Sequence, residues 1–323
     1  MGRSSSTKSL ERVQQQLASK RLRRSSDFID SDRFDAEDRL SELATAISDF
    51  PMLTELQRHV VVSSIACLQT YHRGFLAIVM RHDITMKLRG SDLIGEKYTL
   101  NEVLKVAGNE AITVEEIIAH AAPVNSVTDM ISWLSKIFDR DFVELIRHAV
   151  PPDFRDIPEG APRIVNDVDQ LLAHLSETFE LRHILAHEAA PRLELSPSIA
   201  ARALHAVEQW IDVTQGVLWQ TVLRDDPLTQ IEMNAVAAKY LQNSSRRLAK
   251  AIRRVRMRLT GEKRFLFSRN HRRWKETVMD FSSLSYGSMK GSMWRSINAH
   301  SLVKMLDARS ADCEDWADYL EMD

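Results

Sequence analysis

Residues that interrupt helices are scarce in this sequence. Its 323 residues include only 10 Gly and 9 Pro, the residues that most often form turns and end helices. Ala, Leu, Arg and Glu, which favour helices, are frequent. This composition predicts an all-α protein in which long helices are joined by few loops.

Cysteine and long apolar runs are also rare. The two cysteines, Cys67 and Cys313, lie far apart, so a disulfide framework is not expected and a reducing compartment is the simpler interpretation. Residues 1–26 have no apolar core of the kind that a secretory signal needs. The longest apolar run, residues 60–80, contains Gln69, His72 and Arg73, whereas a membrane span needs ~20 apolar residues. We therefore expect a cytoplasmic protein with no membrane partner.

Several common catalytic motifs are missing. The chain has no Gly-rich phosphate loop, no Cys-x-x-Cys pair and no Gly-x-Ser-x-Gly elbow. Its histidines are scattered without the spacing of metal ligands, so we interpret His72 and most others as surface or hydrogen-bonded side chains. We expect no metal and no cofactor.

Charge and loop residues divide the chain into three parts. Residues 1–33 form a flexible arm that is basic up to residue 26 and acidic after it; either a nucleic-acid-binding arm or a solvated tail fits this pattern. Residues 34–225 form a helical domain, and residues 228–323 form a second helical unit with an acidic tail. Asp225, Asp226 and Pro227 mark the boundary.

Apolar residues three and four apart predict the individual helices. Thr113 and Glu116 have the spacing of a capping box, while Ser196 and Pro197 have the pattern of a helix cap and first turn. The expected helices cover residues 52–84, 99–108, 113–122, 126–149, 163–187, a segment starting at 197, 228–260, 262–283 and 294–310.

Polar side chains gather at the end of the 163–187 segment. Projection at about 100° per residue places His183 on the apolar stripe of Leu175 and Phe179. Arg182 and His187 fall at the two edges of this stripe. Polar groups are costly to bury without partners, and such departures from a local pattern often mark functional sites. Histidine moves protons near neutral pH and arginine binds phosphate, so this set fits phosphodiester cleavage without a metal.

The spacing of Arg182 and His187 is weak evidence by itself. A second pair with the same spacing, Arg295 and His300, occurs near the C-terminus, and we interpret it as a coincidence on a surface helix. Positions five apart also lie about 140° apart around a regular helix. Joint action of Arg182 and His187 would need a frayed helix end, a long arginine reach or a second subunit.

The domain over residues 34–225 resembles the HEPN superfamily of helical bundles. The resemblance rests on Arg182-His183-x-x-x-His187 near the end of the penultimate long helix, followed by Glu188 and one final helix. It implies a homodimeric, metal-independent endoribonuclease that cleaves RNA by attack of the ribose 2′-OH, with two motifs in a composite cleft. It also implies a general acid or base in His187, phosphate stabilisation by Arg182 and a helper in His183.

The same resemblance implies a biological setting. Ribonucleases of this kind act as toxins or as antiphage or stress effectors, so an antitoxin or regulatory protein is a further expected partner. Other members of the superfamily only bind, so a non-catalytic dimerisation or partner-binding module is the alternative.

The segment 228–323 has a distinctive set of residues: Gln230, Met233, Asn234, Ala237, Tyr240, Trp274, two Gly-Ser-Met triplets (287–289 and 291–293), Leu302 and Arg309. With this set the segment resembles the lysozyme-inhibitor LprI-like family. The cysteines that the family usually has near the tryptophan are missing, which makes a lysozyme-binding role the weakest alternative and favours reuse of the fold inside the cell.

A basic segment, residues 246–273, holds twelve Lys or Arg and one acid, Glu262. Such a patch attracts a phosphate backbone. The expected RNA-binding residues are Arg246, Lys250, Arg253 and Arg254. Residues 312–323 carry six acids and no base, so the alternative is that this tail neutralises the basic surface, either as an inhibitor or simply for solubility.

Overall fold

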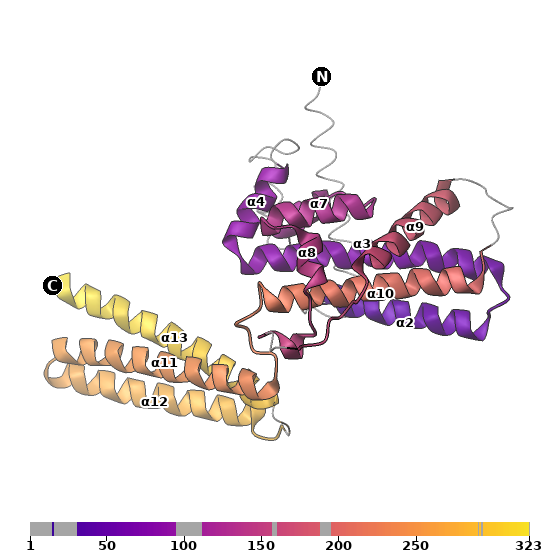
Figure 1. The fold of residues 1–323 in the computed structure, drawn as a ribbon. Helices are drawn as coiled ribbons and strands as arrows, with labels where there is room; N and C mark the ends of the chain where they lie inside the picture. The colour runs from indigo at the N-terminus through magenta and orange to yellow at the C-terminus, as the bar shows by residue number, and fades with distance from the viewer. Residues whose placement is uncertain are drawn as a thin grey trace. The chain divides into compact units, whose positions relative to one another are not determined.

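The computed structural model describes residues 15, 31–94, 112–156, 160–187, 195–289, 291 and 293–322. Over these residues the protein is all-α, with eleven α-helices, one short 3₁₀ helix and no strand (Figure 1). Backbone contacts divide the chain into Met1–Asp225 and Asp226–Asp323. In the described part of the chain, no helix combines the length and the apolar character that crossing a membrane requires.

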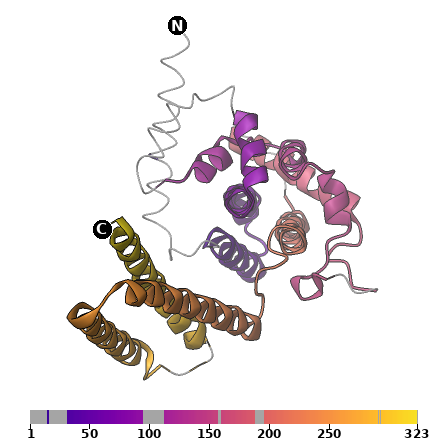
Figure 2. The same cartoon turned by 90° about the vertical axis from the view of Figure 1, so that its left-hand side faces the viewer.

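A central helix, α3 (Thr54–His82), organises the first unit. It packs against α2 (Ser31–Asp49), α4 (Ile84–Ile94), α6 (Val114–Ala121), α9 (Val168–His187) and α10 (Pro197–Gln220) (Figure 2). Its buried residues recur at three- and four-residue spacing, as in Val61, Ile65 and Leu68. Every residue over 74–80 is also buried, so neighbours cover that part of the helix on all sides. The remaining elements are α7 (Val127–Phe138), α8 (Phe142–Arg147) and a 3₁₀ helix, η1 (Pro152–Phe154).

Several expected helix boundaries in this unit are wrong, two of them at aspartates. The helix expected over 52–84 ends at His82, because Asp83 is extended and its carboxylate accepts hydrogen bonds from the amides of Thr85 and Met86, which start α4. The single helix expected over 126–149 is broken between α7 and α8. Asp139 adopts a left-handed conformation there and Asp141 caps α8.

Other expectations for the first unit are confirmed. Thr113 and Glu116 form the reciprocal capping box at the start of α6. Ser196 accepts a hydrogen bond from the amide of Ile199 and Pro197 begins α10. The helix expected over 99–108 lies outside the described residues, as does nearly all of the arm expected over 1–33, although α2 already begins at Ser31.

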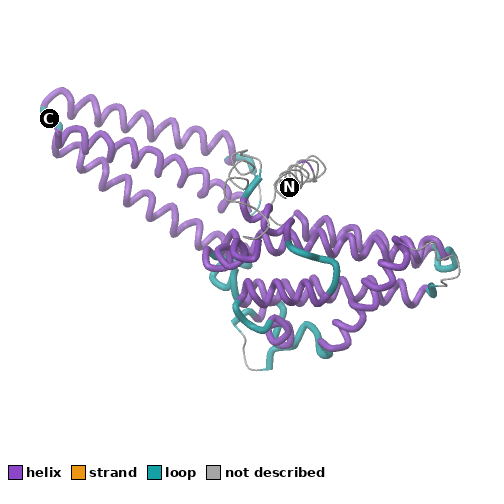
Figure 3. Tube along the Cα trace, turned by 90° about the horizontal axis from the view of Figure 1, so that it is seen from above, coloured by secondary structure: helices purple, strands orange, loops and turns teal. Residues whose placement is uncertain are grey.

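Three long helices make up the second unit: α11 (Gln230–Arg258), α12 (Gly261–Tyr286) and α13 (Met293–Met322) (Figure 3). Ion pairs of Arg247 with Asp307 and of Arg254 with Asp318 show that α11 and α13 run parallel. Their core contains Leu248, Ala251, Ile252, Val255, Leu259, Phe267, Cys313 and Ala317.

The last helix is longer than expected. We expected it to end near residue 310, with an acidic tail beyond, but α13 continues to Met322. Cys313 and Ala317 are buried and Leu320 packs against the core at helical spacing, so these side chains hold the acidic segment in the helix while its carboxylates stay at the surface.

Candidate functional site

Helix α9 positions Arg182, His183 and His187. It packs against α3, α7, α8 and α10 through Val168, Leu171, Leu175 and Phe179. It begins five residues later than expected because Asp167 accepts a hydrogen bond from the amide of Gln170, which is the geometry of a helix cap.

The structure changes which residue continues the buried row of α9. His183, expected on the apolar stripe, is exposed, while Leu181 and Leu185 on the same stretch of α9 still pack against the core. Arg182 is half-buried and continues the row of Leu175, Thr178 and Leu185 at spacings of three and four. A half-buried arginine keeps part of its apolar stem out of water, while the imidazole of the next residue, His183, is exposed to solvent.

His187 is the last residue of α9, and its side chain lies outside the described part of the structure. The helix is continuous through His187, so the backbone does not fray before it. The Cα positions of Arg182 and His187 therefore lie about 140° apart around the axis. Two of the three expected ways to bring them together remain, a long arginine reach and a second subunit.

The four expected RNA-binding residues differ in their surroundings. Arg246, Lys250 and Arg253 are exposed and recur at helical spacing on the side of α11 opposite the buried Val255. Arg254 is half-buried and donates hydrogen bonds to Asp318 and Glu321 of α13, at 2.7 Å and 3.2 Å.

Three acidic residues of α13 form ion pairs with a neighbouring row of α11. Besides Arg254, this row includes Arg247, which pairs with Asp307 at 2.7 Å, and Arg258, which pairs with Glu321. Three bases of α11 are thus neutralised within the unit, whereas the row of Arg246, Lys250 and Arg253 remains open to solvent.

The second Arg–His pair has a different environment. Arg295 and His300 on α13 are both exposed, so neither is half-buried as Arg182 is. This pair is a matched control for the α9 motif, because it has the same residue types at the same spacing on a helix.

A buried histidine was missed by the sequence interpretation. His72 on α3 is fully buried, and neither ring nitrogen has a hydrogen-bond partner among the described residues. Burial, with a smaller contribution from Arg73, lowers the pKa of His72 to about 3. Its position four residues from the apolar Leu68 and Leu76 was the available signal.

Across the described residues, no group of three or more His, Cys, Asp or Glu is arranged to hold a metal ion. The protein is all-α, with two helical units and a polar motif at the end of α9. Comparisons with protein-family models, curated proteins and solved structures found no match to this chain.

Proposed function

We propose that this protein is a metal-independent endoribonuclease of the HEPN type, with Arg182 and His187 as its main catalytic residues and His183 as a helper. The observation that carries the proposal is the half-buried Arg182 in the inward-facing row of α9, next to an exposed His183 and one turn before the helix ends at His187. A guanidinium on a partly buried stem, beside a solvent-accessible imidazole, fits the binding of a phosphate next to a proton-transfer group.

The reaction transfers the phosphodiester within one strand. A neutral imidazole removes the proton of the ribose 2′-OH, and the 2′ oxygen forms a bond to the adjacent phosphorus. The bond from phosphorus to the 5′ oxygen of the next nucleotide breaks, and that oxygen takes up a proton from an acid. The products are a 2′,3′-cyclic phosphate and a 5′-hydroxyl. Arg182 stabilises the negative charge on the phosphate oxygens during the transfer.

The helix geometry favours a site built by two subunits. Within one chain the Cα positions of Arg182 and His187 lie about 140° apart around α9. In a homodimer, the arginine of one α9 and the histidine of the other face one phosphate without distortion of either helix. The exposed row of Arg246, Lys250 and Arg253 is proposed to hold the RNA backbone. The protein would act in the cytoplasm as a toxin or an antiphage or stress effector, restrained by an antitoxin or regulatory protein.

The test is cleavage of end-labelled RNA in EDTA by the full-length protein, with detection of cyclic phosphate ends. Arg182→Ala and His187→Ala are expected to lower the rate about 100-fold or more, with a smaller loss for His183→Ala. The matched controls Arg295→Ala and His300→Ala should cleave as the parent does. No cleavage by the parent protein, or equal losses in the control variants, contradicts the proposal.

Mixing the two inactive variants tests the shared site. A heterodimer of Arg182→Ala and His187→Ala contains one cleft with both intact residues if the two come from different subunits. Such a mixture should recover part of the activity, whereas a site within one chain would stay inactive.

The second candidate is a non-catalytic partner-binding module. Exposed aromatic residues of the second unit, Trp316 and Tyr319 among them, favour it. An inactive parent protein that still forms a stable assembly would support this candidate.

A further inference from the structure

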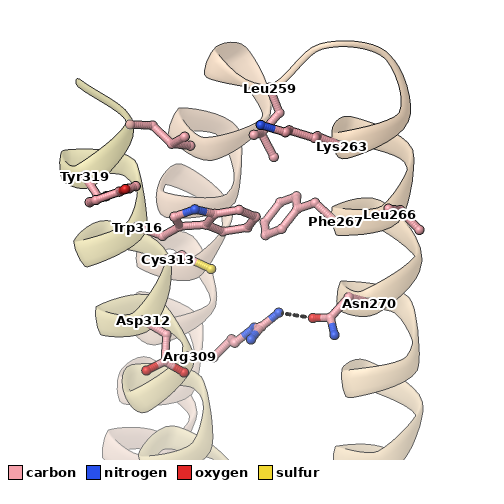
Figure 4. Close-up of a pocket in the computed structure, with 11 residues that line it drawn as sticks. Leu259, Lys263, Leu266, Phe267, Asn270, Arg309, Asp312, Cys313, Trp316 and Tyr319 are labelled. Carbon is pink, nitrogen blue, oxygen red and sulfur yellow. Dashed lines mark hydrogen bonds between the residues drawn. The ribbon is translucent and has the colours of Figure 1, made fainter. Parts of the chain in front are cut away.

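A groove of about 680 Å³ runs between α12 and α13 in the second unit (Figure 4). Two contacts join the helices that form its walls. Arg309 donates a hydrogen bond of 2.6 Å to Asn270, and the rings of Phe267 and Trp316 meet edge-on with their centroids 5.3 Å apart. These contacts show that the two helices are antiparallel, because Phe267 precedes Asn270 while Trp316 follows Arg309.

Large apolar side chains line this groove and remain open to solvent. Leu266 is 42% exposed, Trp316 is 39% exposed and Tyr319 is 56% exposed. A contiguous apolar surface of this kind marks an interaction site more often than isolated exposed residues do. Aromatic residues are also enriched in protein interfaces.

The two sides of the groove carry opposite charges. Residues 262–275 of α12 contain six Lys or Arg and one acid, whereas residues 307–322 of α13 contain six acids and one Arg. Lys263 and Asp312 line the groove itself. Arg273 lies two turns after Leu266, and Asp315 lies between Asp312 and Tyr319 at helical spacing, so they extend the basic and the acidic edge.

These edge residues have no ion-pair partner among the described residues. The acids of α13 that do pair with α11 are Asp307, Asp318 and Glu321. Asp312 and Asp315 on one edge, and Lys263 and Arg273 on the other, remain unpaired within the described unit. The charge on each edge is therefore available to a partner.

We propose that the occupant of this groove is the same groove of a second copy of the chain, in a symmetric dimer whose two-fold axis runs along the helices. This axis places α12 of each copy on α13 of the other. A two-fold axis across the helices would instead set the basic edges against each other, which costs energy. Only the first arrangement brings opposite charges together and closes both apolar grooves.

The heights of the charged residues along the helices specify which of them pair across the dimer. The contacts of Asn270 with Arg309 and of Phe267 with Trp316 place Asp312 and Asp315 between Arg273 and Lys263 along the axis. The dimer pairs Lys263 with the partner's Asp315 and Arg273 with the partner's Asp312. Each pair occurs twice, as a self-complementary interface requires. This interface lies in the second unit and does not depend on whether the chain cleaves RNA.

Charge reversal on the full-length protein tests the dimer. The mass of the particle in solution is measured by sedimentation across a range of protein concentrations. One variant carries Lys263→Glu and Arg273→Glu, so that both edges are acidic, and a second carries Asp312→Lys and Asp315→Lys, so that both are basic. Each alone is expected to dimerise at least about tenfold more weakly than the parent.

An equimolar mixture of the two variants is the decisive sample. In the mixed dimer every acidic edge meets a basic edge, so the mixture should recover the dimer of the parent protein. Helix content and thermal unfolding establish that each variant folds, and recovery in the mixture itself shows that both are folded. Arg246→Glu with Arg253→Glu, on the exposed row of α11, is the control and should not change the mass.

Three outcomes overturn the inference. They are a parent protein that remains monomeric at the highest concentration, a dimer unaffected by either reversal, and a mixture that fails to recover the dimer although both variants are folded. Trp316→Ala adds an apolar test, because it removes the largest exposed ring from the groove and should weaken the dimer without charge reversal.

Discussion

Arg254 of α11 donates a hydrogen bond of 2.7 Å to Asp318 of α13, and a second of 3.2 Å to Glu321. This places an arginine that the sequence assigns to RNA binding inside an intramolecular charge network. The neighbouring row of Arg246, Lys250 and Arg253 faces solvent on the same helix. The two rows should therefore respond differently to substitution.

The first prediction concerns the salt dependence of RNA binding. Replacement of Arg246, Lys250 and Arg253 by Ala should weaken binding and reduce the slope of log affinity against log salt by about 2, because each phosphate contact to single strands contributes about 0.7. Arg254→Ala is the comparison and should leave the slope nearly unchanged, since Arg254 is paired with carboxylates. Fluorescence anisotropy at several salt concentrations measures both. An equal loss of slope in Arg254→Ala would count against the assignment.

The second prediction concerns His72 and the pH dependence of stability. Its pKa of about 3 in the folded protein lies below the value of about 6.5 in an unfolded chain. The unfolded state therefore binds more protons between these values, and His72 makes stability fall as the pH drops below about 6.5. At pH 5 this loss amounts to about 2 kcal/mol.

Urea unfolding at pH 7 and pH 5 measures this loss. His72→Leu should lessen the difference between the two pH values, because the substituted side chain does not titrate. The same substitution at His205, whose side chain is 67% exposed, should leave the difference as it is in the parent. An unchanged difference in His72→Leu would show that other groups cause the acid sensitivity.

The third prediction concerns the close packing at Gly216 on α10. A Cβ added there would lie 2.5 Å from Cδ1 of Ile164 and 2.8 Å from the carbonyl oxygen of Val150. A backbone carbonyl cannot move away as a side chain can, so Gly216→Ala should destabilise the first unit by about 1–3 kcal/mol. Gly90→Ala should cost less, because the nearest atom is the flexible Met80 sulfur at 2.6 Å. Thermal unfolding of both variants compares them, and equal costs would contradict the explanation.

The fourth prediction concerns the capping box of α6. Thr113→Ala removes the hydroxyl that accepts from the Glu116 amide, at 3.3 Å, and should lower the free energy of unfolding by about 1 kcal/mol. Thr113→Ser keeps the hydroxyl and should retain most of the stability. Chemical unfolding separates the two, and similar losses would show that the cap contributes little.

Local sequence signals located many helix ends correctly. Thr113 with Glu116, and Ser196 with Pro197, mark helix starts because their hydrogen bonds are made within one turn of backbone. The break at Asp139 was missed because the apolar spacing on both sides continues across it, while the contacts that hold it come from Arg89 of α4. Arg89 donates hydrogen bonds to the carbonyl oxygen of Ile137 and to the carboxylate of Asp139.

The candidate site also depends on tertiary packing that the local sequence pattern does not contain. The pattern identified Arg182, His183 and His187 as polar residues at the end of an apolar stripe. It predicted His183 on the stripe and Arg182 at its edge, which is the reverse of their observed surroundings. His183 is exposed and Arg182 half-buried because α9 turns the row that ends in Leu185 toward the helix bundle. Which row of a helix faces its neighbours is decided by packing, and the apolar spacing within α9 does not settle it.

The sequence by itself determined the helical class of this protein and the basic and acidic segments of its last helices, because propensity, apolar spacing and charge are properties of single segments. Only the tertiary structure decided which charges meet. It pairs Arg254 with Asp318 and leaves Arg246, Lys250 and Arg253 in solvent. It also separates the basic edge of α12 from the acidic edge of α13 by an apolar groove. These outcomes depend on the register and distance between helices, which arise from the packing of side chains far apart in the sequence.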